Sequence, residues 1–177
     1  MVPPTPPKPN QMYRAIQRIN TSFPSFLRSK AFTWGFNSLI PYSGTTGLVV
    51  EQLDATRAVV HCRNRRRVQN HIKGVHATAM ATLAESATGM LFGQYVPDNT
   101  HLPLLKSMNI QYKRMAKGNL TATATLTDEQ IRLISTTDRG STVVDVVVKD
   151  ESGNEPIECA LEWAWTVRKQ NEKSTKK

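Results

Sequence analysis

A helix that is apolar on most of its sides is the feature of this sequence that restricts its fold most. Over residues 78–93, small and apolar side chains recur at three- and four-residue steps: Ala79, Met80, Leu83, Ala84, Ala87, Met90 and Leu91. Such a helix must be buried on most sides. Glu85 lies in the middle of it. An unpaired buried carboxylate is costly, so Glu85 needs a partner, an altered pKa or a chemical role.

Beyond residue 44, most of the chain outside this helix alternates with the two-residue period of β-strands. Residues 46–54 and 56–67 are predicted to form a hairpin that closes near Asp54. Further strands are predicted over residues 102–115, 120–126, 142–148 and 157–167. These segments have one apolar face each, which is typical of an antiparallel sheet that covers a core.

Two details of these strands are also predicted. On the strand at 102–115, Leu104, Met108, Ile110 and Tyr112 are expected to share the core face. The strand that begins at residue 120 is expected to continue through 131–136. Together the patterns predict an α+β fold in which a five- to six-stranded antiparallel sheet wraps around one long central helix.

The N-terminal region is predicted to contain two segments that precede this domain. Residues 1–10 are rich in proline, so we expect a disordered lead. Residues 11–43 have helical spacing, with Pro24 well placed at a helix start, and are expected to pack on the core. The sheet and helix form the domain at 44–168, and residues 169–177 form a polar disordered tail.

Charge and cysteine content limit the partners. The net charge is 23 − 14 = +9, but residues 1–10 and 168–177 contribute five of these charges, so the body has only +4. This distribution weakens a nucleic-acid interpretation. No apolar run approaches the roughly 18 residues of a membrane span, so we expect a soluble protein with no membrane partner. Cys62 and Cys159 lie in predicted strands, which indicates reduced thiols.

The compartment depends on the first forty residues. Reduced thiols favour a cytoplasmic location. The Arg-bearing stretch at 11–40 has no Asp or Glu, which is also typical of a transit peptide, so a mitochondrial location is the alternative.

A short motif surrounds the start of the central helix. Asn70 precedes His76 by six positions, Ala77 and Thr78 follow, and Glu85 lies further along the helix. This arrangement resembles the Asn–x5–His–Gly–Gly … Asp/Glu signature of small acyl-CoA thioesterases of the phenylacetate-pathway type, which have the hotdog fold. Two positions depart from the signature, since Ala77-Thr78 replaces Gly-Gly and the acid is Glu rather than the commoner Asp.

The resemblance extends beyond the motif. Residues 107–112 resemble the strand that follows the helix in these enzymes, and the similar region covers about 44–168. The helical segment at 11–43 resembles that of an uncharacterised thioesterase-like branch of the superfamily. The resemblance therefore implies an acyl-CoA substrate and a dimer or pair of dimers with shared sites.

Thioester hydrolysis needs donors for the oxyanion and a carboxylate that attacks or deprotonates water. The N–H of Ala77, with that of Thr78, lies at a helix start and suits the carbonyl oxygen. Asn70 is expected to orient the carbonyl or a water, and Glu85 to be the nucleophile or general base. His76 and Ser107 are expected beside the substrate, with His76 chiefly fixing the loop.

The spacing of the motif predicts that two chains form each site. Ala77 and Glu85 are eight residues apart, which is about 12 Å along a helix. A Glu side chain cannot cover that distance, so the carbonyl held by one helix start requires Glu85 of a second, antiparallel subunit.

A cluster of four arginines precedes the motif. Arg65 and Arg67, with Arg63 and Arg66, are expected to hold the phosphates of coenzyme A, because guanidinium groups match phosphate oxygens. A solvated strand face is the alternative. No metal ligand set is evident, and no cofactor is expected apart from the coenzyme A of the substrate.

The sequence thus predicts a thioesterase-like hydrolase that releases a carboxylic acid and free coenzyme A. Two alternatives stay open. One is a hotdog hydratase or dehydratase in which His71 and Glu85 move protons, and the other is a non-catalytic acyl-binding domain. Acyl length, the choice between coenzyme A and acyl-carrier protein, and dimer or tetramer are left undecided.

Overall fold

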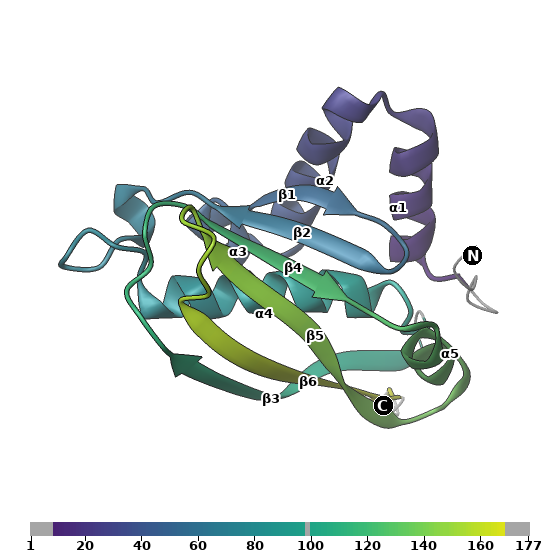
Figure 1. Cartoon of the computed structure of the whole chain (residues 1–177). Coiled ribbons are helices and arrows are strands. Elements are labelled where there is room, and N and C mark those ends of the chain that lie inside the picture. The colour runs from purple at the N-terminus through teal and green to yellow at the C-terminus, as the bar shows by residue number, and fades with distance from the viewer. Residues whose placement is uncertain (1–8, 98–99, 169–177) are drawn as a thin grey trace, which may run out of the picture.

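The structure is a computed structural model that describes residues 9–97 and 100–168. In these residues, six strands form one antiparallel sheet in the order β1-β2-β4-β5-β6-β3 (Figure 1). The strands are β1 Val49–Leu53, β2 Arg57–Cys62, β3 His101–Tyr112, β4 Leu120–Thr125, β5 Gly140–Asp150 and β6 Ile157–Val167. The helices are α1 Gln11–Ser22, α2 Ser25–Leu39, α3 Pro41–Thr46, α4 Ala77–Gly93 and α5 Asp128–Thr136. The predicted fold class is confirmed.

The central helix α4 runs across one face of the sheet (Figure 1). Leu83, Ala84, Ala87 and Leu91 are fully buried, and α4 packs on β2, β4, β5 and β6. Each buried leucine contributes about 1.5–3 kcal/mol through the area it removes from water. The helix is thus held by packing on most of its sides, as its composition predicts.

The strand alternation and the turns follow the sequence closely. Ala122 and Ala124 of β4 are buried on the helix side. The hairpin of β1 and β2 closes where the Asp54 N–H donates to the Arg57 carbonyl at 3.0 Å. The turn before β6 is organised by Asp150, whose Oδ1 accepts hydrogen bonds from the N–H groups of Ser152 and Asn154.

One predicted face of β3 is wrong because the strand contains a bulge. The pairing with β6 shifts register between Leu105 and Ser107, so one strand has an extra residue there. An extra residue exchanges the two faces of a strand. Leu105 therefore packs on the core together with Met108, whereas Leu104 lies on the other face and is half exposed.

The predicted strand over residues 131–136 is also wrong, since this segment is part of α5. Thr127 and Gln130 form a capping box: each side chain accepts a hydrogen bond from the backbone N–H of the other. Ile131 and Ile134 are buried beneath the helix. Helical spacing of two isoleucines, with a cap before them, outweighs the β propensity of this segment.

The N-terminal segment is helical, as predicted. Pro24 is the N-cap residue of α2, and Phe32 and Phe36 are the buried residues of this helix, which packs on β1. Asn10, which we counted in the disordered lead, is the buried N-cap residue of α1 and accepts a hydrogen bond from the Tyr13 N–H at 2.7 Å. The rest of the predicted lead up to residue 8, and the predicted tail at 169–177, lie outside the described residues.

Both cysteines are free. Burial raises the pKa of Cys62 and of Cys159 to about 11, so neither thiol ionises near neutral pH. Within residues 9–97 and 100–168, we find no helix with the length and hydrophobicity of a membrane span.

Candidate functional site

A pocket of about 580 Å³ lies along the face of α4 that turns toward the N-terminal helices and the β3–β6 side of the sheet. This volume is in the range of ligand-binding pockets, roughly 300–1,000 Å³. The α4 residues that line it occupy one face of the helix: Thr82, Glu85, Ser86, Gly89, Met90 and Gly93. Its walls are largely apolar, which suits a hydrocarbon chain.

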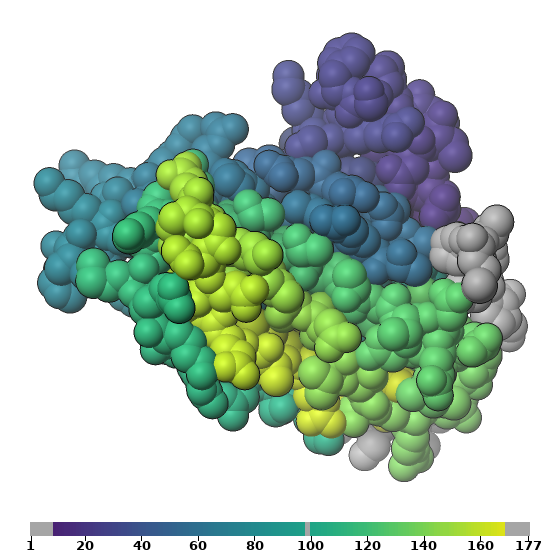
Figure 2. All heavy atoms as spheres, viewed as in Figure 1, coloured from purple at the N-terminus to yellow at the C-terminus, as the bar shows by residue number. Residues whose placement is uncertain are grey.

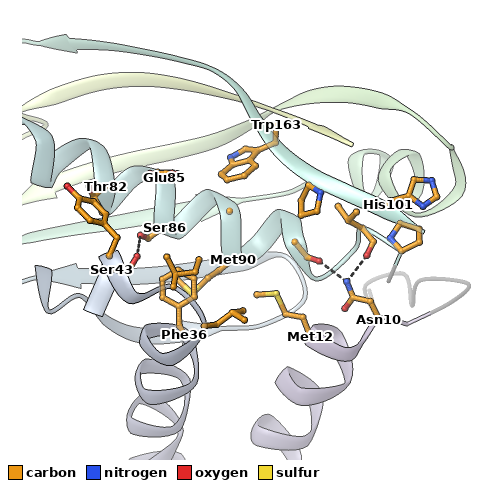
Figure 3. A pocket seen from close by; sticks show the side chains of 18 of the residues that line it. Asn10, Met12, Phe36, Ser43, Thr82, Glu85, Ser86, Met90, His101 and Trp163 are labelled. Atoms are coloured by element: carbon orange, nitrogen blue, oxygen red, sulfur yellow. Dashed lines mark hydrogen bonds between the residues drawn. The ribbon is translucent and has the colours of Figure 1, made fainter. Parts of the chain in front are cut away.

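The N-terminal segment forms one wall of this pocket (Figure 3). Phe36 of α2 and Met12 of α1 supply apolar surface. The wall is anchored by Asn10, whose Nδ2 donates to the carbonyls of Gly93 and Val96 at 2.7 Å each. The segment at 9–46 is therefore part of the pocket.

The opposite wall comes from the sheet. Trp163 of β6 lines the pocket and stacks on Phe92 of α4, with ring centroids 5.5 Å apart. Its Nε1 donates to Thr88 Oγ1 at 3.0 Å, which fixes the orientation of the indole. Pro103, before the bulge of β3, lines the same side.

Glu85 faces this pocket from the middle of α4 (Figure 3). Within the described part of the chain, its carboxylate has no hydrogen-bond or ion-pair partner. Partial burial raises the pKa of this carboxyl above its usual value of 4.5. The sequence left three explanations for an acid at this position, and the structure shows an altered pKa without a partner. A carboxylate in this state is a candidate general base.

The start of α4 offers a free hydrogen-bond donor. His76 is the N-cap residue: its Nδ1 accepts from the Thr78 N–H at 3.2 Å and is joined to Thr78 Oγ1 at 2.8 Å. The Ala77 carbonyl accepts from the Tyr112 hydroxyl at 3.1 Å. Among the residues that the structure describes, the Ala77 N–H has no acceptor. The helix start is thus well anchored, with one donor open for a ligand.

The structure does not bring this donor and Glu85 together within one chain. Neither Ala77 nor Thr78 lines the pocket that Glu85 faces. Eight residues of helix separate Ala77 from Glu85, which corresponds to about 12 Å. Both groups act on one thioester only if two chains meet.

Asn70 organises the loop before α4. Its Oδ1 accepts hydrogen bonds from the N–H groups of Ile72 and Gly74 at 3.1 and 3.0 Å, and its own N–H donates to the Gly74 carbonyl. Lys73 has a φ of +64°, so the tight turn holds a non-glycine residue in the left-handed region. The side-chain Nδ2 of Asn70 has no hydrogen-bond partner within residues 9–97 and 100–168.

The arginine cluster does not lie on a strand. β2 ends at Cys62, and a short 3₁₀ helix at Arg66–Val68 follows, so the prediction of a strand that continues to residue 67 is wrong. The reason is a contact with a residue distant in the chain: the Asn64 N–H donates to Asn119 Oδ1 instead of continuing the strand ladder. All four arginines are exposed, and none has an acidic partner in the described part of the chain.

Two further predicted residues lie outside the pocket. Ser107 follows the bulge of β3, is exposed, and lies 3.4 Å from Glu162 on the face with the Lys106–Glu162 ion pair. His71 is exposed in the loop before α4 and does not line the pocket with Glu85. No group of three potential metal ligands occurs in residues 9–97 and 100–168.

Sequence reasoning missed the walls of the pocket. Nothing in the alternation of residues 157–167 indicates that Trp163 borders a cavity. Asn10 carries a detectable signal, since Asn immediately before a helical run is a common N-cap. Met12 and Phe36 lie in the predicted helical segment at 11–43, where no sequence signal indicates that they line a pocket.

Comparison with known protein families identifies the family of this chain. Residues 28–166 match the family described as "Domain of unknown function (DUF4442)". The chain belongs to this family. No curated protein matches it significantly.

Solved structures show the fold of this DUF4442 chain. A Pseudomonas aeruginosa protein of unknown function, described as a probable thioesterase, is 24% identical, with a TM-score of 0.71 over 78% of this chain and 95% of that one. A thioesterase from Haemophilus influenzae is 13% identical, with a TM-score of 0.64 over 79% and 94%. A mutant thioesterase from P. aeruginosa is 17% identical, with a TM-score of 0.64 over 77% and 94%. The DUF4442 chain therefore has the hotdog fold of thioesterase-like proteins.

Proposed function

We propose that this DUF4442 chain is an acyl-CoA thioesterase-like hydrolase with a site shared by two copies of the chain. The observation that carries the proposal is Glu85. Its carboxylate is partly buried, has a raised pKa and no partner in the described residues, and faces a largely apolar pocket of about 580 Å³. Such a carboxylate makes no stabilising polar contact within the described chain, and it lies beside a pocket that fits an acyl chain.

Each group has a role in the reaction. The acyl chain lies in the pocket, and its thioester carbonyl accepts a hydrogen bond from the Ala77 N–H at the positive end of the partner's helix. Glu85 removes a proton from water as the oxygen attacks the carbonyl carbon. The carbon–sulfur bond then breaks, the proton passes to the leaving thiolate, and the products are a carboxylic acid and coenzyme A.

The sheet has an edge that supports such a pairing. β3 is an edge strand of twelve residues, and within one chain its outer edge has no strand partner among the described residues. Long uncovered edges favour pairing with another strand. Two β3 strands related by a two-fold axis perpendicular to the sheet would place both α4 helices antiparallel on the same face.

The arginine cluster lies close in the chain to the oxyanion donor. The His76 N–H donates to the Val68 carbonyl at 2.8 Å, so the segment with Arg65, Arg66 and Arg67 is tied to the start of α4. Exposed guanidinium groups without acidic partners suit the phosphates of coenzyme A. The cluster thus offers the carrier a site beside the donor at Ala77.

The test is thiol release from short, long and aromatic acyl-CoA substrates. Glu85→Gln keeps the shape of the side chain and removes the base, so turnover should fall by about 10²-fold or more. Glu155→Gln changes an exposed loop residue before β6 and should leave the rate unchanged. Full activity in Glu85→Gln would contradict the proposed role of this acid.

The other outcomes separate the alternatives. Acyl-CoA binding without thiol release would assign the pocket to a non-catalytic acyl-binding domain. Loss of enoyl absorbance without thiol release would indicate a hydratase. That reaction would need His71 of a second copy near Glu85, because the loop of the same chain keeps His71 outside the pocket.

A further inference from the structure

The hairpin of α1 and α2 has an outer surface that the hotdog core does not use. The joined ends of the two helices project away from the sheet (Figures 1 and 2). Phe23 lies between the helices and is 39% exposed, and Phe26 in the first turn of α2 is 76% exposed. Trp34, further along α2, is 77% exposed. We call Phe23, Phe26 and Trp34 the aromatic ridge.

The aromatic ridge is distinct from the packing face of α2. Phe32 and Phe36 are buried and attach the helix to the body. Phe26, Lys30 and Trp34 recur at four-residue steps on the opposite, exposed side. Removing a large aromatic side chain from water is favourable by about 1.5–3 kcal/mol. Three such residues on one projecting element therefore indicate a surface that binds something apolar.

The charge around the ridge indicates what that partner is. Residues 9–50 contain Arg14, Arg18, Arg28 and Lys30 but no Asp or Glu. The acids near these helices, Glu51 and Asp54, line the groove that faces the β1–β2 hairpin together with Arg28. Lys and Arg near an anionic bilayer contribute about 1 kcal/mol each, and aromatic rings favour the headgroup region. A symmetric contact between two copies would instead set these cations against each other. Aromatic and cationic groups on one element therefore match an anionic lipid surface better.

We propose that the aromatic ridge and its flanking cations form a peripheral docking surface for an anionic lipid bilayer. Docking of this kind needs no membrane span, since an amphipathic surface lies in the interface. It revises the sequence expectation of no membrane partner, which rested on the lack of a spanning run. The other end of α2 leads to Leu39 and Tyr42, which line the pocket, so α2 links the docking surface to the pocket.

The experiment is sedimentation of the full chain with phosphatidylcholine vesicles that contain or lack phosphatidylserine. The chain should bind vesicles with phosphatidylserine and dissociate at high salt. Phe26→Ser/Trp34→Ser should weaken binding about tenfold or more. Arg18→Gln/Lys30→Gln should also weaken it about tenfold, but only where phosphatidylserine is present. The matched control is Arg132→Gln/Leu133→Ser, which removes an exposed cation and apolar group from α5.

Trp34 fluorescence reports the same event independently. Trp165 is buried and Trp163 lies against α4, so a blue shift on vesicle binding should arise from Trp34 and disappear in Trp34→Phe. Binding that is absent, or unchanged in Phe26→Ser/Trp34→Ser, would overturn the proposal. Light scattering would also overturn it if the wild type were an oligomer and this variant were dissociated, since the ridge would then be an interface between copies. Thiol release is a separate measurement, and its failure would not affect this proposal.

Discussion

The indole of Trp163 lies directly against Gly89 of α4. A β-carbon added at Gly89 would come within 2.8 Å of Cη2 and Cζ2 of the ring. The ring cannot retreat easily, because its Nε1 donates to Thr88 and its face stacks on Phe92. The missing side chain at Gly89 therefore allows a tryptophan to border the pocket.

Gly89→Ala should destabilise the chain. The substitution gains about 1 kcal/mol of helix propensity but overpacks the site, which typically costs about 1–3 kcal/mol. We expect a net loss of up to about 2 kcal/mol in denaturant unfolding. Gly35→Ala is the matched control, since an added β-carbon there meets no atom within 4 Å and should stabilise α2. Stabilisation by both substitutions would show that Trp163 moves freely.

Glu85→Gln should raise the stability of the chain at neutral pH. A carboxyl whose pKa is higher in the folded state binds more protons when folded, so the stability falls as pH rises from the usual value of 4.5 through the raised pKa. Above this window Glu85→Gln should be more stable than the wild type, and below pH 4.5 the difference should vanish. Thermal unfolding across this pH range measures it. A difference that does not vary with pH would contradict the raised pKa.

Two substitutions of Asn70 should separate its structural and chemical roles. Asn70→Asp keeps an oxygen to accept from the N–H groups of Ile72 and Gly74, so the loop and the stability should be retained. It replaces the free Nδ2, so thiol release should fall about tenfold or more if this group orients the thioester. Asn70→Ala should lose activity and about 1–2 kcal/mol of stability. Equal activity in Asn70→Asp and the wild type would make Asn70 a loop residue only.

Asn10→Ala should remove the hydrogen bonds that attach α1, and with it the N-terminal wall of the pocket, to the end of α4. Asn10 is 4% exposed, and within the described residues its side chain makes three hydrogen bonds, to the Tyr13 N–H and to the carbonyls of Gly93 and Val96. Losing the cap and two donors should cost about 2–4 kcal/mol in unfolding experiments. Asn10→Asp retains the cap, but it sets a carboxylate oxygen, which cannot donate, against the carbonyls of Gly93 and Val96. This variant should therefore be no more stable than Asn10→Ala. If Asn10→Asp were as stable as the wild type, the only stabilising role of the Asn10 side chain would be that of a helix cap.

The elements that could be predicted from the sequence are those whose signal is local. The apolar steps of α4 and the alternation of β4 and β6 each lie within one segment, so their faces follow from spacing alone. The helix α5 was missed although Thr127 and Gln130 have the spacing of a capping box. In this segment the capping residues favour a helix and the composition favours a strand, and the structure has the helix.

The errors on β3 and at the arginines have a different origin. A bulge near Lys106 leaves no mark in an alternating sequence, because it depends on how β6 pairs with the strand. β2 ends at Cys62 because Asn119, distant in the chain, captures the N–H of Asn64. Glu85 could be singled out from its surroundings, whereas the wall that faces it required knowledge of where residues 10–43 pack.

The pocket is assembled from parts that obey different constraints. Glu85 projects from α4, whose other side chains are largely buried against the rest of the domain. Few substitutions of these buried side chains would therefore leave the fold intact. Met12 faces the same space from α1, which precedes the residues 28–166 that match the DUF4442 family, and it is not fully buried. Mutations in this first helix can therefore change the size of the ligand that fits while the acid stays in place. Under the proposed function, the size of the acyl group that is accepted would therefore depend partly on a helix that lies outside the matched region.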